Sequence, residues 1–286
     1  MSMRAIGAAV VGGAVAATVW GAAWAAGPPD FGVNDFMAHK EAFGFHGGQS
    51  ATLNGAAIYY ETYGAGPPVL VLHGGTAFIE TMHYQIEALA KDRLVIAPDS
   101  RGHGRSGDGP GPLHYHQMGE DMVALMDRLH VARADVVGWS DGGVIGLDLA
   151  IHHPDRVRRL VLMGANYDVA GLSGDGAQPA ADAPAVAIQR DMYRRLSPTP
   201  DQWPVFYGKV VQMWRTEPHD TPAELARIRA PVLVIAGEHD AIRREHTDAL
   251  AKTIPNAKEV IIPAATHFAP LTHPQAVDAA ILAFLN

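Results

Sequence analysis

Short apolar runs alternate with amphipathic segments along most of this chain. Eight runs follow a strand-like pattern, and they cover residues 50–53, 56–63, 69–72, 93–97, 134–137, 157–163, 232–236 and 259–262. Segments with apolar residues at helical spacing stand between or after them, at 82–91, 118–129, 144–150, 244–254 and 274–285. This alternation predicts a mostly parallel sheet that is covered by helices on both faces.

Two stretches before residue 64 have other patterns. Asn54-Gly55 joins the first two strand-like runs, and this dipeptide is typical of a type I′ turn, so the runs should form a hairpin. Residues 28–48 are rich in Gly, carry scattered aromatic residues and show no period. We expect them to form an arm on the surface.

The α/β alternation is interrupted between residues 167 and 227. This segment starts with a stretch rich in Ala, Gly and Pro, and it continues with helix-like pieces at 187–196, 202–214 and 222–228. It predicts a helical cap inserted into an α/β core that is made of residues 27–166 and 228–286. The aromatic residues of the segment serve either to hold the cap to the core or to contact a substrate.

The first 26 residues differ from the rest of the chain. A basic residue, Arg4, precedes an apolar stretch of Ala, Gly and Val, and Ala23-Trp24-Ala25 offers a cleavage site between small residues. The apolar stretch is short and weakly hydrophobic, which favours a signal peptide over an uncleaved membrane anchor. We therefore expect a periplasmic or secreted bacterial protein without stable membrane association after cleavage.

The composition of the chain excludes several kinds of function and chemistry. The net charge of -8 and the pI near 6.0 do not indicate a nucleic-acid-binding protein, which would carry an excess of basic residues. With no cysteine, the chain has no disulfide, thiolate metal site or cysteine nucleophile. The fifteen histidines show no metal-ligand spacing, and His152-His153 before Pro154 should be a solvated helix end. We expect neither a metal nor a cofactor, and no feature indicates an oligomeric state.

A Gly-x-Ser-x-Gly pattern, Gly138 to Gly142, separates the apolar run 134–137 from the helix-like run that follows it. Such a serine lies on a sharp turn from strand to helix, with its hydroxyl exposed at the sheet edge. Glycines are required there because side chains two positions before and after the serine would collide. The pattern predicts Ser140 as a catalytic nucleophile.

A serine nucleophile needs a base and an acid that orients the base. Because ligands bind at the carboxyl ends of parallel strands, both partners should directly follow strands. Asp240 and His267 do so, in the chain order serine, acid, histidine. Glu238, or an acid acting from Asn166–Asp168 after the preceding strand, is the alternative to Asp240.

Two backbone amides should stabilise the negative charge that develops on the substrate oxygen. One is the N–H of Asp141 at the start of the helix, where the helix dipole also favours an anion. The other is Gly75, with Thr76 as the alternative, in the loop His73-Gly74-Gly75-Thr76 after the third run. We expect His73 itself to order this loop. Side chains near the serine and in the cap should bind the substrate: Thr76, Trp139, Asn166, Trp203, Tyr207 and Trp214.

From residue 51 onward the chain resembles the α/β-hydrolase superfamily, in the branch with a helical cap after the sixth strand. The resemblance rests on segments 73–75, 99–106, 138–143, 237–240 and 266–268, which stand in the family's order. The resemblance implies an eight-stranded sheet. It also implies a structural rather than a chemical role for the arginine-containing loop 99–106. The elbow Gly-Trp-Ser-Asp-Gly-Gly is most similar to the valacyclovirase (biphenyl-hydrolase-like) group. That likeness implies recognition of a substrate amino group by the Asp141 side chain, although complementing the helix dipole is the more ordinary role.

These features predict a serine hydrolase that cleaves a carboxylic ester (EC 3.1.1) of a small to medium-sized substrate through an acyl-enzyme. The same residues would also serve a lactonase, an amidase, a carbon–carbon bond hydrolase or a cofactor-free perhydrolase. A ligand-binding protein of this fold without turnover is a more remote alternative.

Overall fold

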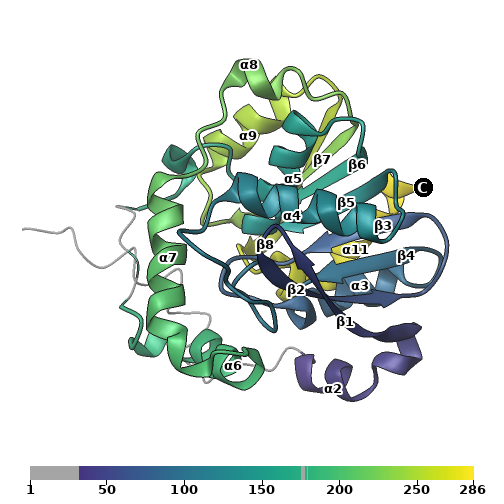
Figure 1. The fold of residues 1–286 in the computed structure, drawn as a ribbon. Coiled ribbons are helices and arrows are strands. Elements are labelled where there is room, and N and C mark those ends of the chain that lie inside the picture. Colours follow the sequence, from purple (N-terminus) through teal and green to yellow (C-terminus); the bar gives the residue numbers. More distant parts are fainter. Residues whose placement is uncertain (1–31, 175–177, 179) are drawn as a thin grey trace, which may run out of the picture.

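The computed structural model describes residues 32–174, 178 and 180–286 (Figure 1). The described chain contains eight strands: β1 (Phe45–Leu53), β2 (Ala56–Tyr63), β3 (Pro68–Leu72), β4 (Leu94–Pro98), β5 (Ala134–Trp139), β6 (Val157–Met163), β7 (Val232–His239) and β8 (Ala257–Thr266). They form one sheet in the order β1-β2-β4-β3-β5-β6-β7-β8. β2 pairs antiparallel with β1 and β4, and the remaining pairs are parallel. The mostly parallel eight-stranded sheet expected from the sequence is confirmed.

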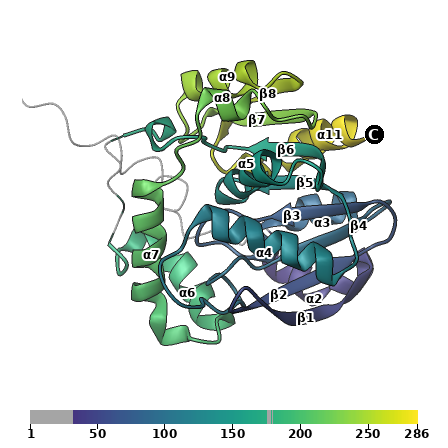
Figure 2. The same ribbon diagram turned by 45° about the horizontal axis from the view of Figure 1, so that its top comes forward.

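Helices cover both faces of this sheet (Figures 1 and 2). On one face lie α4 (Tyr115–Arg128), α5 (Asp141–His152) and α9 (Arg244–Thr253), whose apolar residues join one core cluster. On the other face lie α3 (His83–Leu89), α10 (Ala269–Thr272) and α11 (Pro274–Leu285), which join the second cluster. The central strands are apolar on both sides, as a sheet covered on both faces requires.

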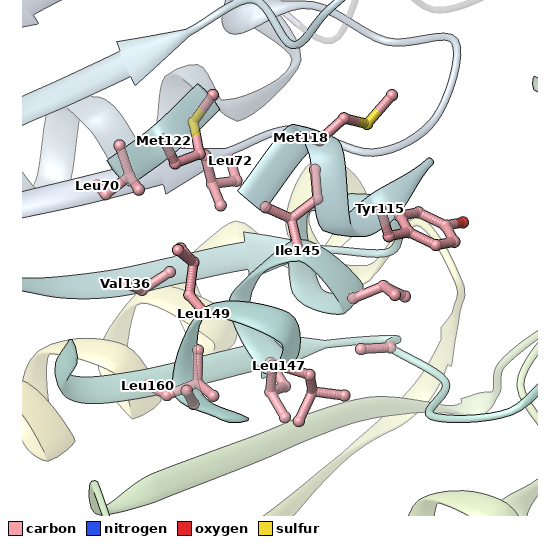
Figure 3. Close-up of a cluster of buried hydrophobic side chains, with 14 of the residues drawn as sticks. Leu70, Leu72, Tyr115, Met118, Met122, Val136, Ile145, Leu147, Leu149 and Leu160 are labelled. Atoms are coloured by element: carbon pink, nitrogen blue, oxygen red, sulfur yellow. The ribbon is translucent and has the colours of Figure 1, made fainter. Parts of the chain in front are cut away.

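Successive residues of the central strands belong alternately to the two clusters, because side chains along a strand point to opposite faces. In β3, Leu70 and Leu72 face α4 and α5, whereas Val69 and Val71 face the other layer. Figure 3 shows the first of these interfaces, where Leu70, Leu72, Val136 and Leu160 from the strands face side chains of α4 and α5. This packing fixes the orientation of α5, which follows the predicted nucleophile.

The predicted hairpin is present, and its turn has the expected backbone. Asn54 and Gly55 have φ values of 45° and 81°, and positive φ at both positions is what a type I′ turn requires. The surface arm predicted for residues 28–48 is wrong for its described part. Residues 32–48 contain α2 (Val33–Ala38), the 3₁₀-helix η1 (Lys40–Phe43) and the start of β1, and the side chain of Phe36 is fully buried.

Lys40 anchors this N-terminal part. It is buried, and its Nζ lies 2.6 Å from an oxygen of Glu61 and 2.8 Å from an oxygen of Glu80. No local pattern indicates this contact, because both partners lie on elements far along the chain. The short 3₁₀-helix η2 (Ile79–Met82) carries Glu80.

The chain between β6 and β7, residues 164–231, lacks a strand in its described part. It contains α6 (Ala187–Leu196), α7 (Trp203–Thr216), α8 (Pro222–Leu225) and the short 3₁₀-helices η3 (Val169–Gly171), η4 (Pro184–Val186) and η5 (Pro200–Gln202). We call it the inserted segment. Figures 1 and 2 show α6 and α7 beside the sheet rather than on either face. The division into cap and core at residues 167 and 227 stays a prediction.

The predicted signal peptide, residues 1–26, lies outside the described residues. None of the described helices combines the length and the apolar character that a membrane crossing requires.

Candidate active site

Ser140 lies on the turn between β5 and α5. Its backbone has φ 53° and ψ −118°, a conformation that costs a residue with a side chain about 1–3 kcal/mol. The surrounding sheet holds this turn, since the Ser140 N–H donates to the carbonyl of Met163 on β6 over 2.8 Å. Ser140 thus precedes the first residue of the helix, as expected for a nucleophile elbow.

The glycines of the turn are a steric necessity. A Cβ atom at Gly138 would lie 2.2 Å from the carbonyl oxygen of Gly142, and one at Gly142 would lie 2.3 Å from the carbonyl oxygen of Leu72. Both distances are far below van der Waals contact, so no side chain fits at either position.

Three side chains from the ends of three strands form a linear hydrogen-bonded chain. His267 Nε2 lies 3.0 Å from Ser140 Oγ, and His267 Nδ1 lies 2.7 Å from Asp240 Oδ1. Asp240 follows β7 and His267 follows β8, which places both at the carboxyl edge of the sheet beside Ser140. All three predicted residues are therefore brought together in the order needed for proton transfer.

The surroundings keep Asp240 charged. Burial alone would raise the pKa of Asp240, but the charge of His267 and the N–H groups of His267, Ile242 and Gly237 lower the pKa below its usual value. Burial alone would lower the pKa of His267, but the charge and hydrogen bond of Asp240 raise it. Because the anionic Asp240 accepts a hydrogen bond from the Nδ1–H of His267, the lone pair on Nε2 faces Ser140.

The alternative acids are engaged elsewhere. Glu238 is exposed and accepts a hydrogen bond from the Ala264 N–H over 2.8 Å. Asp168 pairs with His219 over 2.9 Å and accepts from the Ala170 N–H. Neither of the two makes a hydrogen bond to His267 among the interactions of the described residues, so Asp240 is the acid that orients the histidine.

The predicted oxyanion amides lie at the same edge. Within the described chain, the N–H groups of Gly75 and Asp141 donate to no acceptor, so both are available to a substrate oxygen. A Cβ built on Gly75 would lie 2.4 Å from Asp141 Oδ2, which places the two residues against each other. The choice of Gly75 over Thr76 as the second donor stays a prediction.

His73 holds the loop that carries Gly75. Its Nε2 accepts the Ser100 N–H over 3.0 Å, so the ring proton is on Nδ1, which donates to the Gly74 carbonyl over 2.7 Å. Burial lowers the pKa of His73 to about 4, and the ring is therefore neutral near pH 7. It orders the loop, as the sequence suggested.

The Asp141 side chain faces two aromatic donors. Its carboxylate accepts from the Tyr115 hydroxyl over 3.0 Å and from Trp214 Nε1 over 2.9 Å. Burial raises the pKa of Asp141 to about 6, although the hydrogen bonds from Trp214 and Tyr115 and the charge of His267 act in the opposite direction. Asp141 thereby links the elbow helix α5 to α4 and to α7 of the inserted segment.

A small pocket opens at Ser140. Of the six side chains predicted to bind substrate, Asn166 and Trp214 line it; the other lining residues are Tyr115, Ser140, Asp141, Leu172, Gln178, Glu217, Ala241, Ile242 and His267. Its volume is about 30 Å³, close to the space of one water molecule.

The other four side chains do not line this pocket, and substrate contact by them stays a prediction. Trp203 and Tyr207 stack on each other inside the inserted segment, with ring centroids 5.1 Å apart. Trp139 Nε1 donates a hydrogen bond to the His267 carbonyl over 2.9 Å, and this bond helps to hold the backbone of the histidine in place. Thr76 turns its hydroxyl to the Gly75 carbonyl. Aromatic content showed where the segment is apolar, but not which rings face inward.

Sequence reasoning missed Tyr115 and Glu217. Glu217 accepts the Tyr115 N–H over 3.0 Å, and Tyr115 in turn donates to Asp141. These contacts join residues 102 and 26 positions apart, so no local pattern could have indicated them.

Comparison with known proteins agrees with this geometry. Residues 67–215 match the model of the alpha/beta hydrolase fold family, and the chain belongs to that family. The chain is 30% identical to the putative carbamate hydrolase RutD of Azorhizobium caulinodans, over 84% of this chain and 96% of the relative.

Solved structures show the same fold. A hydrolase from Pseudomonas aeruginosa PA01 matches with a TM-score of 0.69 and 28% identity, over 84% of this chain and 99% of that one. The enol-lactonase from Burkholderia xenovorans LB400 matches with a TM-score of 0.66 and 26% identity, over 83% and 99%. These relatives support hydrolase activity. The likeness of the elbow to the valacyclovirase group stays a prediction.

Proposed function

We propose that this protein is a serine hydrolase that cleaves a carboxylic ester through an acyl-enzyme. One observation carries the proposal: the hydrogen-bonded chain from Asp240 through His267 to Ser140 at the carboxyl edge of an α/β-hydrolase sheet. A hydroxyl next to a neutral imidazole, which is itself held by a buried carboxylate, is an activated nucleophile.

The reaction follows from these positions. Ser140 Oγ attacks the ester carbonyl carbon while His267 Nε2 takes the hydroxyl proton, and the carbonyl oxygen becomes an anion facing the amides of Asp141 and Gly75. His267 then gives the proton to the leaving alcohol, and the C–O bond breaks. Water attacks the acyl-enzyme with His267 again as the base, the acid is released, and the proton returns to Ser140. Each amide of such a pair typically contributes about 2.7–4 kcal/mol.

A lactone is the second candidate substrate, because a cyclic ester reacts by the same steps. It is favoured by the likeness to the enol-lactonase from Burkholderia xenovorans LB400. The relative named as a putative carbamate hydrolase makes a carbamate a further substrate to assay.

A fluorophosphonate probe and short p-nitrophenyl esters test the proposal. Wild type should be labelled once and should hydrolyse the esters, and Ser140→Ala should lose both properties. Ser50→Ala is the control, since Ser50 is exposed on β1 far along the sheet from Ser140. Unlabelled wild type, or a Ser140→Ala protein that hydrolyses as fast as wild type, would refute the assignment.

The Asp141 carboxylate bears on substrate preference. A carboxylate accepts about four hydrogen bonds, and Tyr115 and Trp214 already supply donors to both oxygens. We infer that its first role is to position the Trp214 ring. Recognition of a substrate amino group is tested by comparing aminoacyl esters with their des-amino analogues in wild type and Asp141→Ala. A rate ratio that is equal in the two proteins would exclude that recognition.

A further inference from the structure

A second group of chemically active side chains lies outside the pocket at Ser140. His116 on α4 and Asp148 and His152 on α5 form a cluster at the surface. His116 Nδ1 lies 3.1 Å from Asp148 Oδ1, and His152 Nδ1 lies 3.0 Å from the same oxygen. His152 Nδ1 also lies 3.1 Å from the Asp148 carbonyl, and His116 Nε2 lies 3.9 Å from Glu120.

The fold brings these residues together in two ways. Asp148 and His152 are four positions apart on α5, so they share one face of the helix. α4 packs against α5, and Gly119 lets Asp148 approach, because a Cβ atom there would lie 2.3 Å from Asp148 Oδ2. His152 is the exposed last residue of α5, as expected for a solvated helix end, and its neighbour His116 comes from α4.

The distances between the side-chain atoms of His116, Asp148 and His152 suit binding of a divalent metal ion as well as hydrogen bonding. Zinc binds imidazole nitrogen and carboxylate oxygen at about 2.0–2.2 Å, so two ligand atoms of a tetrahedral site lie about 3.3–3.5 Å apart. The three ligand atoms lie within 4.8 Å of one another, and two of their separations are 3.0 and 3.1 Å. Small side-chain rotations would bring all three onto one ion.

The surroundings carry an excess of negative charge. The cluster borders a cleft of about 280 Å³ whose lining includes the carboxylates of Asp148, Glu217, Asp220 and Glu224 and no Lys or Arg. Within the described chain, the Asp220 carboxylate accepts no hydrogen bond.

We propose that His116, Asp148 and His152 form a binding site for a divalent transition metal ion such as Zn²⁺. Two imidazoles and one carboxylate supply three ligands, and the cleft leaves the remaining position open to water or to Asp220. Metal binding at the Nδ1 atoms requires each imidazole to carry its proton on Nε2, so a metal replaces the Nδ1–H contacts to Asp148. The site is separate from Ser140, although Tyr115 and Glu217 line both spaces.

Calorimetric titration of the untagged protein with Zn²⁺ tests this. Wild type should bind one ion saturably, and His116→Gln and His152→Gln should each weaken binding at least about tenfold. His39→Gln is the matched control. His39 makes the same type of contact with Asp35, four positions away and 3.1 Å distant, and no third ligand joins them within the described part of the chain. Asp220→Asn should weaken binding less, because water can take the fourth position in place of Asp220.

A second readout separates lost ligands from lost folding. Zn²⁺ should raise the melting temperature of wild type and of His39→Gln but not that of the two cluster variants, whose melting temperatures without metal should equal that of wild type. Co²⁺ should give a visible ligand-field absorption in wild type that is absent from the cluster variants. Absence of saturable binding to wild type, or equal affinity in His152→Gln and wild type, would overturn the proposal.

Discussion

The buried carboxylate of Asp141 should make the protein less stable as the pH rises. We predict that Asp141→Asn stabilises the folded state near neutral pH. Asparagine is neutral at every pH, and its side-chain oxygen can still accept from both Tyr115 and Trp214, which donate to Oδ1 of Asp141. The substitution therefore removes the buried charge and keeps the hydrogen bonds to Oδ1, while the contact of Trp214 Nε1 with Oδ2 is lost.

The magnitude follows from the pKa of Asp141. Burial raises it from 3.8 to about 6 in the folded protein, so between these values the folded state holds more protons than the unfolded state. The free energy of unfolding then falls as the pH rises through that window, and it is constant above it. Since one pKa unit is worth about 1.4 kcal/mol, the ionised carboxylate should destabilise the fold by about 3 kcal/mol at pH 7.5 and by about 0.6 kcal/mol at pH 4.

Urea unfolding of both proteins at pH 4 and pH 7.5 measures this difference. The advantage of Asp141→Asn should grow from about 0.6 kcal/mol at pH 4 to about 3 kcal/mol at pH 7.5. Asp240→Asn is a control of opposite sign. The pKa of Asp240 is lowered, so its charge contributes stability above pH 3.8 that is lost as the pH falls, and its replacement should destabilise at pH 7.5. An Asp141→Asn effect that is equal at both pH values would refute the reasoning.

Two further predictions concern His267 and Lys40. The kcat/KM for a short ester should fall at acid pH with an apparent pKa above 6.5, because Asp240 raises the pKa of His267 and the base must be neutral. Asp240→Asn should shift this fall in kcat/KM to lower pH. An unchanged pH profile in Asp240→Asn would contradict the assignment of Asp240 as the acid. Lys40→Met should lower the free energy of unfolding by about 3–5 kcal/mol, since it leaves Glu61 and Glu80 buried without this cation. A loss below about 1 kcal/mol in urea unfolding would show that the N-terminal part is not anchored by this contact.

Much of the fold could be predicted because its signals are local. The alternation of apolar runs predicted the sheet and its two helical layers, and the predicted spans 187–196 and 274–285 are those of α6 and α11. Asn54-Gly55 predicted the hairpin turn because few residues adopt positive φ. The prediction for the N-terminal part was wrong because its structure depends on contacts that are not local. Lys40 binds Glu61 and Glu80, and short-range sequence patterns carry no information about such partners.

The sequence by itself determined which residues lie at the carboxyl edge of the sheet. Ser140, Asp240 and His267 each follow a strand, and parallel strands end at one edge, so strand order alone brings them near one another. Only the tertiary structure decided which side chains face that edge. It turned Trp214 and Tyr115 toward Asp141, packed Trp203 and Tyr207 inside the inserted segment, and joined His116 on α4 to Asp148 and His152 on α5. The physical reason is that the direction of a side chain depends on the packing of helices that are distant in the sequence.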